Sequence, residues 1–192
     1  MFAFGKALAV TETTLVYSNV PETLPAWSAG TTYAANAQVR QAVGGIQRIF
    51  TSKAGGNLAH DPALDTTATY WTGEGPTNRY AMFDGSRGSR TVHPSEIVVI
   101  VRADGWVNTA TVQNVDAAEI QLTQTDALEG LVYDETFDMV SDSGILDPFA
   151  YCFTPITRLS DLTLMELKPY SDSLIMARIS NPGGNAACGE FG

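Results

Sequence analysis

The chain is poor in basic residues. Its 192 residues include 11 Lys and Arg against 21 Asp and Glu, which gives a formal net charge of −10. A protein that follows a phosphate backbone needs a clustered positive face, and the nearest group here is Arg79, Arg87 and Arg90 around the Gly/Ser loop 85–89. We interpret these arginines as parts of a solvated loop, so nucleic acid is not an expected partner.

Long apolar runs are also missing. Hydrophobic residues make up 44% of the chain, which is enough for a packed core, but no run reaches the roughly 18 residues of a membrane span. The apolar start 1–10 has its cation, Lys6, after the aromatic residues and is cut short by Thr11, unlike a signal peptide. We expect a strand over 8–17, and we expect 1–10 to offer a docking edge for strand addition.

Cysteine and histidine are scarce. Cys152 and Cys188 have no Cys or His at metal-ligand spacing nearby, and both are interpreted as buried reduced thiols. A bridge between them stays open, because the sequence does not give the Cα separation that decides it. His60 and His93 lie in turn-like segments and are interpreted as polar loop residues.

The groups that catalysis requires are not arranged in a recognisable motif. Five acidic residues fall within one segment, namely Asp134, Glu135, Asp138, Asp142 and Asp147. Carboxylate pairs hydrolyse glycosides only at a defined spatial separation, which sequence spacing does not show. The segment also lacks the pattern of a calcium-binding loop. We therefore expect no catalytic site, no metal site and no cofactor, and predict that the protein is not an enzyme.

Short strand-like runs dominate the sequence. Val, Ile, Thr and Tyr recur between Gly, Pro, Asn and Asp punctuation. Two such runs, 38–43 and 46–51, flank Gly44-Gly45, which predicts a tight hairpin because both glycines accept positive φ. The β-branched run 96–102 is typical of a central strand buried on both faces. Further strands are expected at 106–112, 119–123, 130–137, 149–154, 162–167, 173–180 and 186–191.

This pattern predicts a mainly β protein with a small β module followed by an antiparallel, jelly-roll-like β-sandwich. The only helix candidate, 62–70, is expected to form a short turn at most, and 181–185 is expected to be a turn. The composition shifts near Gly73–Pro76. We therefore divide the chain into 1–75, an N-terminal strand plus the small module, and 76–192, the sandwich.

Aromatic residues are concentrated in the small module: Trp27, Tyr33, Phe50, Tyr70 and Trp71. A module of this size has little core volume, and aromatic rings fill it efficiently. The alternative is that the flat rings stack on the C–H face of a sugar. The string from Pro25 through Val39 to Phe50-Thr51-Ser52 and Tyr70-Trp71 resembles the small chitin-binding-type carbohydrate-binding modules of families 5 and 12. The chain departs from that pattern at Asn36-Ala37-Gln38. The resemblance implies carbohydrate binding by Trp27, Tyr33, Tyr70 and Trp71.

A second resemblance begins at Gly75. The segment Gly75-Pro76-Thr77-Asn78-Arg79-Tyr80-Ala81-Met82-Phe83-Asp84-Gly85 is similar to one found after such a module in minor tail proteins of phages and prophages. The remaining chain of those proteins, a jelly-roll-like sandwich, is echoed in this sequence at 97–101, 168–170, 174–179 and 187–190. We interpret 78–85 as a structural clasp in which Tyr80, Met82 and Phe83 plug the sandwich where the linker enters, with ligand binding as the alternative.

These resemblances imply a virion structural protein of the tail tip or baseplate. It would act in tail assembly and host attachment, be made in the host cytoplasm, and contact other tail proteins and its own copies, partly through exposed sandwich edges. The alternative function is that of a carbohydrate-binding adhesin that contacts host surface glycans.

Overall fold

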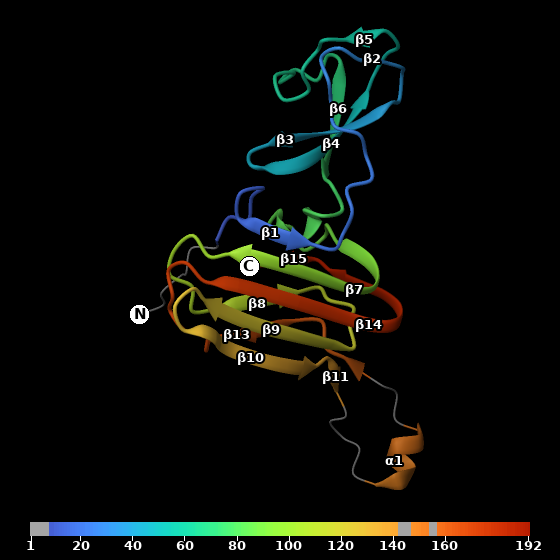
Figure 1. The fold of residues 1–192 in the computed structure, drawn as a ribbon. Helices are drawn as coiled ribbons and strands as arrows, with labels where there is room; N and C mark the ends of the chain where they lie inside the picture. The colour runs from blue at the N-terminus through green and yellow to red at the C-terminus, as the bar shows by residue number, and fades with distance from the viewer. Residues whose placement is uncertain (1–7, 142–146, 154–156) are drawn as a thin grey trace.

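The fold was obtained as a computed structural model, which describes residues 8–141, 147–153 and 157–192. It is mainly β, with antiparallel pairing in every sheet, so the predicted fold class is confirmed. Figure 1 shows a small β module above a β-sandwich, and a hairpin that carries α1 below it. Two separate hydrophobic clusters form the cores of the sandwich and the module. Neither described helix is long and apolar enough to cross a membrane.

One layer of the sandwich is a five-stranded sheet. In spatial order it contains β1 (Leu15–Ser18), β7 (Thr91–Arg102), β14 (Leu174–Cys188), β9 (Glu119–Asp126) and β10 (Gly130–Asp138). The predicted central strand is β7, but only alternate residues are fully buried, Ile97, Val99 and Val101, while Val98 and Ile100 are half-buried. The expectation of burial on both faces was therefore wrong, because one face of this sheet meets solvent.

The other layer is a three-stranded sheet with the order β13 (Leu162–Leu164), β8 (Ala110–Gln113) and β15 (Glu190–Phe191). Side chains from both layers share one core, which includes Ile97 and Ile179 from the larger sheet and Val112 and Phe191 from the smaller one. Alternation of inward and outward side chains along each strand supplies this core. The strand expected at 106–112 is shorter, because regular pairing starts only at Ala110.

Two expectations in the second half of the chain were wrong. The segment 181–185, expected to be a turn, lies inside β14, which continues past an irregularity to pair Asn185 with Pro94. A strand was expected at 149–154, but residues 149–153 belong to the short helix α1 (Pro148–Phe153), between β11 (Val140–Ser141) and β12 (Thr157–Arg158), and residue 154 lies outside the described residues. Cys152 on this helix is exposed rather than buried, whereas Cys188 is buried, and both thiols are free.

The small module contains two sheets. One has the order β3 (Gln38–Val43), β4 (Ile46–Ser52) and β6 (Trp71–Pro76), and the other pairs β2 (Thr32–Tyr33) with β5 (Asn57–Leu58). The Gly44-Gly45 hairpin is confirmed, with φ of 66° and 87° at the two glycines. Val43 pairs with Ile46 directly across this turn, as a two-residue primed turn requires. Residues 62–70 form turns.

The segment after the module joins it to the sandwich. Tyr80 and Met82 are buried, and the short 3-10 helix η1 (Ala81–Phe83) packs near β15. The Asn78 side chain pairs with the backbone of Val92 as a neighbouring strand would. Its Nδ2 donates to Val92 O (2.9 Å), and its Oδ1 accepts from Val92 N (2.9 Å). These contacts give 78–85 the structural role expected of a clasp.

The N-terminal part of the chain is divided between the two bodies. The strand expected at 8–17 begins only at Leu15, and β1 pairs with β7 of the sandwich although we grouped it with the module in 1–75. Most of the expected docking edge 1–10, and Asp142 of the acidic segment, lie outside the described residues.

Candidate functional site

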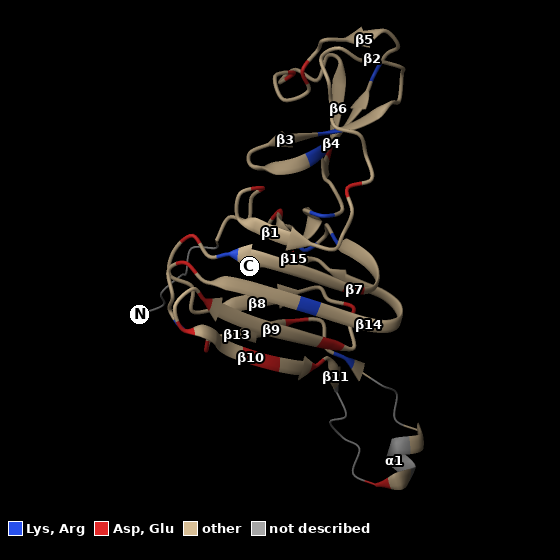
Figure 2. Cartoon of the chain, in the orientation of Figure 1, with Lys and Arg blue, Asp and Glu red and all other residues tan. Residues whose placement is uncertain are grey.

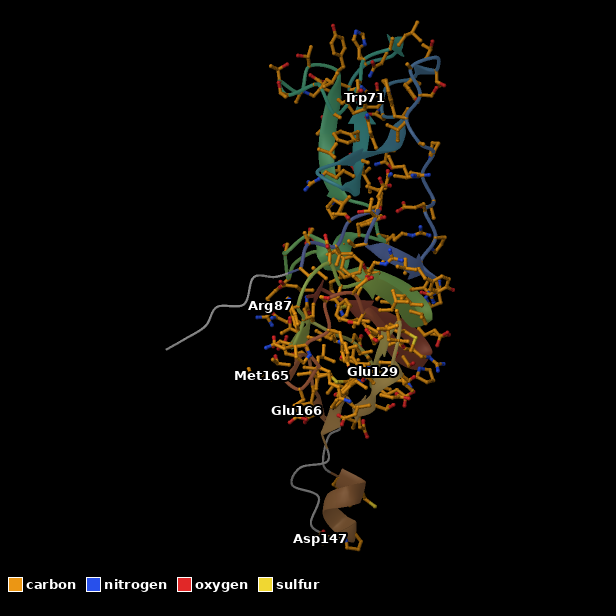
Figure 3. The ribbon with its side chains drawn as sticks, turned by 60° about the vertical axis from the view of Figure 1, so that its left-hand side comes forward. Trp71, Arg87, Glu129, Asp147, Met165 and Glu166 are labelled. Atoms are coloured by element: carbon orange, nitrogen blue, oxygen red, sulfur yellow. The ribbon has the colours of Figure 1, made fainter. Side chains whose placement is uncertain are left out.

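Two of the four predicted sugar-stacking residues form the core of the small module. Trp71 is 2% exposed and Tyr33 is 8% exposed, and their rings meet edge to face with centroids 5.2 Å apart. Trp71 donates its indole N–H to His60 O (2.8 Å), and the Tyr33 hydroxyl accepts from Ser28 N (2.7 Å). Neither ring presents a face to solvent, so burial excludes both as stacking surfaces. Figure 3 shows Trp71 within the module.

Trp27 also serves the core. It is half-buried and packs against the cluster of Tyr33, Val39 and Trp71. Its backbone is fixed beside β3, since Trp27 N donates to Arg40 O (2.9 Å). The indole Nε1 is buried and has no hydrogen-bond partner among the described residues. This placement favours packing over ligand contact.

Tyr70 differs from the other three. It is 42% exposed, and one face of its ring lies on the imidazole of His60, with centroids 3.4 Å apart and planes 8° from parallel. The imidazole covers one face of the ring, and 42% of Tyr70 remains exposed to solvent. Tyr70 and Trp71 are neighbours in sequence but point to opposite environments, as adjacent residues do in extended backbone.

A chain of hydrogen bonds fixes the imidazole beneath Tyr70. His60 Nδ1 is 2.9 Å from Asn57 Oδ1, and Asn57 Nδ2 donates to the buried Ser52 Oγ (2.9 Å). Asn57 is itself 4% exposed. Side chains held by buried hydrogen bonds lose little further freedom when a ligand arrives. The Tyr70–His60 pair is therefore a preorganised aromatic platform.

The loop that carries Tyr70 is held by Asp65. Its carboxylate accepts hydrogen bonds from the backbone amides of Thr69 (2.9 Å), Tyr70 (2.7 Å) and Trp71 (2.9 Å). Desolvation is the largest single influence on the pKa of Asp65 and raises it, but the three amides and the Thr67 hydroxyl together outweigh it and lower the pKa below its ordinary value. A charged carboxylate thus positions the platform at neutral pH.

The structure brings the predicted residues together only in part. Trp27, Tyr33 and Trp71 share a core, Tyr70 alone of the four lies on the surface, and His60, interpreted as a polar loop residue, is its partner. Leu58 and Leu64, in the same loop region, are 47% and 77% exposed and add apolar surface. Nothing in the local sequence marks His60, because its contact with Tyr70 spans ten positions.

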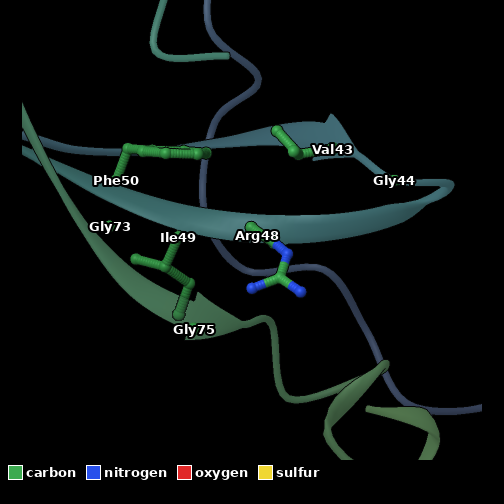
Figure 4. A pocket seen from close by; sticks show the side chains of 7 residues that line it. All are labelled: Val43, Gly44, Arg48, Ile49, Phe50, Gly73 and Gly75. Carbon is green, nitrogen blue, oxygen red and sulfur yellow. The ribbon is translucent and has the colours of Figure 1, made fainter. Parts of the chain in front are cut away.

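A second surface feature of the module is a shallow hollow of about 340 Å³ on the sheet β3-β4-β6 (Figure 4). Phe50, Ile49 and Val43 supply its apolar lining, and Arg48 is the only charged residue that lines it. This lining offers apolar contact area, and it contains no pair of carboxylates of the kind that glycoside hydrolysis uses. Within the described residues, no three His, Cys, Asp or Glu side chains gather as a metal site.

Comparisons with known proteins give limited similarity. No protein-family model matches the chain, and no curated protein matches it. Two solved structures of chitosan-binding module 1 from a chitosanase/glucanase of Paenibacillus sp. IK-5, one of them a selenomethionine-labelled mutant, are similar over 58% of this chain and 80% of theirs. The mutant gives a TM-score of 0.38 at 11% identity, and the other gives 0.37 at 12%.

Proposed function

We propose that this chain is a carbohydrate-binding protein and that its small module contacts a glycan through Tyr70. The observation that carries the proposal is the exposed Tyr70 ring stacked on a fixed His60 at 3.4 Å. The C–H face of a pyranose is flat and apolar, and a tyrosine ring matches it in size and polarity. The stack gains affinity because both rings are ordered before the ligand arrives.

Polar groups beside the platform supply directional contacts. The hydroxyls of Thr67 and Thr69 lie 2.8 Å apart on the same exposed loop, and Lys53 donates its ammonium to Ala68 O. Hydroxyl and ammonium groups next to an aromatic face are the arrangement that orients a sugar ring. The proposal keeps the carbohydrate binding that the resemblance implied but replaces the four-residue site with one centred on Tyr70.

The test is a glycan array followed by calorimetry with a chitin hexasaccharide and with the best array ligand. Tyr70→Ala should weaken binding at least about tenfold, while Tyr70→Phe should keep most of the affinity, because only the ring face is used. The matched control is Tyr17→Ala, which removes a 50% exposed tyrosine of β1 in the sandwich. The proposal is wrong if no glycan on the array binds the protein, or if Tyr70→Ala binds the glycan as tightly as the parent chain.

We also propose that the chain binds without catalysis. The platform consists of two rings that hold each other, and His60 Nδ1 is already engaged by Asn57. A bound oligosaccharide should therefore remain intact during long incubation with the protein, as measured by chromatography. Shortened products that depend on the intact protein would overturn this expectation.

A second proposal is that the chain is a structural component of a phage tail that uses this module at the host surface. The observation that favours it is the clasp, because Asn78, Tyr80 and Met82 of the resembling segment join module and sandwich. Such a protein would contact other tail proteins and copies of itself. Immunogold labelling of purified phage particles should locate the protein in the tail, and its absence from the particles would overturn the proposal.

A further inference from the structure

Three loops meet at one end of the sandwich, far along the chain from the platform. The β7–β8 loop (103–109), the β9–β10 turn (127–129) and the β13–β14 loop (165–173) leave the same end because Leu174 pairs with both Arg102 and Thr125. In Figure 1 this is the left-hand end of the sandwich. The end therefore combines side chains from three separate parts of the sequence.

The first loop presents an indole to solvent. Trp106 is 78% exposed, whereas Trp27 and Trp71 pack in the small module. The backbone on both sides of Trp106 is fixed, since Gly105 N donates to Ser171 O (3.1 Å) and Val107 bridges to Tyr170. An exposed aromatic residue on ordered backbone is typical of an interface anchor.

The neighbouring turn adds an apolar side chain. Leu128 is 96% exposed, and its turn is ordered because Asp126 accepts from Leu128 N (2.8 Å) and Glu129 N (3.0 Å). The Tyr170 hydroxyl donates to Glu129 and so ties the turn to the third loop. Glu129 is labelled in Figure 3. We call the set Trp106, Leu128, Tyr170, Asp104 and Glu129 the loop-end surface.

The charge at this end is mainly negative. Four acidic residues lie in or next to these loops, namely Asp104, Asp126, Glu129 and Asp172, and two basic residues accompany them, Arg102 and Lys168. The loops there carry several red segments in Figure 2. Arg102 is 3.9 Å from Asp172, the closest ion pair of this group. Asp104, two residues before Trp106, makes no hydrogen bond or ion pair with any described residue. Its charge is available to a partner.

We propose that the loop-end surface docks a lysine- or arginine-bearing segment of a partner polypeptide. A cationic head over the Trp106 indole gains from the negative ring face, and the Asp104 carboxylate supplies the counter-charge. Leu128, on the neighbouring turn, offers apolar surface to the rest of the partner segment. An acidic segment would be repelled, and a neutral sugar would leave the carboxylates unused, so charge complementarity selects a basic peptide.

The probe is an amidated, N-acetylated peptide of alternating glycine and lysine, titrated into the full chain while the Trp106 indole N–H is followed by NMR. The peptide should shift this resonance, and raising the salt from about 0.05 M to about 0.5 M should weaken binding because exposed charges are screened. Trp106→Ala should weaken binding at least about tenfold and Asp104→Asn severalfold. A glycine–glutamate peptide should not bind.

Two variants serve as matched controls. Leu64→Ala removes a 77% exposed apolar side chain from the small module, and Glu119→Gln removes an exposed charge at the start of β9, the opposite end of the sandwich. Both should bind the lysine peptide like the parent chain. The proposal is overturned if the lysine peptide does not bind, if Trp106→Ala binds it equally, or if a glucosamine oligomer binds this surface in its place. Because Tyr70 is untouched, failure here is separate from failure of the glycan proposal.

Discussion

At the scale of single residues, the two thiols should differ in reactivity, because Cys188 is buried and Cys152 is exposed. Cys188 is fully buried, and desolvation raises its pKa to about 12, while Cys152 is exposed on α1. Only the thiolate reacts with alkylating reagents. Iodoacetamide at neutral pH should label Cys152 and leave Cys188 unmodified in the native protein, as measured by peptide mass spectrometry. In urea both should react, and equal native labelling would contradict the buried position of Cys188.

Gly189 is a residue at which a single methyl group matters. A Cβ there would lie 2.8 Å from Asn114 Cβ and 2.9 Å from Arg87 O, too close for ordinary contact. Gly189→Ala should lower the free energy of unfolding by roughly 1–3 kcal/mol, since packed structure must shift to admit it. Urea denaturation measures this change. Gly30→Ala is the control, because nothing lies within 4 Å of its added Cβ, and a larger loss there would contradict the steric reason.

At the scale of an element, the loop 65–71 depends on one carboxylate. Desolvation raises the pKa of Asp65 more than any other single cause, but the hydrogen bonds from Thr69, Trp71 and Tyr70 together outweigh it, so the pKa in the folded chain is lowered below its ordinary value of 3.8. A lowered folded pKa means that the stabilisation is present above about pH 4 and is lost as the pH falls through the folded pKa. The Tyr70–His60 contact, followed by NMR, should therefore persist at pH 5 and weaken in strong acid.

A substitution of Asp65 tests whether this carboxylate acts on its own loop and not on the rest of the chain. Asp65→Ala removes the acceptor of three amides and should release the Tyr70 platform at neutral pH, with glycan binding falling in step. Asp126→Ala removes a similar turn carboxylate from the β9–β10 turn, where it accepts from Leu128 and Glu129. The second variant should leave the Tyr70–His60 contact unchanged, and equal effects would contradict local control by Asp65.

Elements were predictable where local chemistry decides them. The Gly44-Gly45 turn follows from two adjacent residues that accept positive φ, and the structure has them at 66° and 87°. The segment 181–185 carries an equally clear turn signal, yet β14 continues because its later residues pair with β7 as far as Thr91. That pairing joins positions about ninety apart, so tertiary contacts override the local signal.

The candidate site shows the same limit. The sequence places aromatic residues in the module but does not say which rings face inward, so Trp71 and Tyr70 look equivalent in the motif. The fold separates them, because β6 turns Trp71 toward Tyr33 and leaves Tyr70 on the surface. His60 joins Tyr70 only through the folded loop, which is why its role could not be read from spacing.

At the scale of the whole molecule, two cores are joined by a narrow set of contacts. The sandwich core and the cluster of Tyr33, Val39 and Trp71 share no residue. Hydrogen bonds between the module and the N-terminal segment that packs on the sandwich run from Glu12 N to Gly45 O (2.8 Å) and from Gln47 Nε2 to Glu12 Oε1 (2.5 Å). Units with separate cores and few shared contacts are expected to unfold separately.

The last prediction tests that separation. Trp71→Ala deletes the largest side chain of the small core, and large-to-small changes of this kind cost about 3–5 kcal/mol, which is a large share of the stability of so small a unit. Hydrogen exchange should show loss of protection in β3 and β4, while β7 and β14 stay protected. Trp106→Ala, which removes an exposed indole, should leave both sets of amides protected. Simultaneous loss across module and sandwich in Trp71→Ala would mean that the chain unfolds as one unit, and that the small module and the sandwich are not separate folding units.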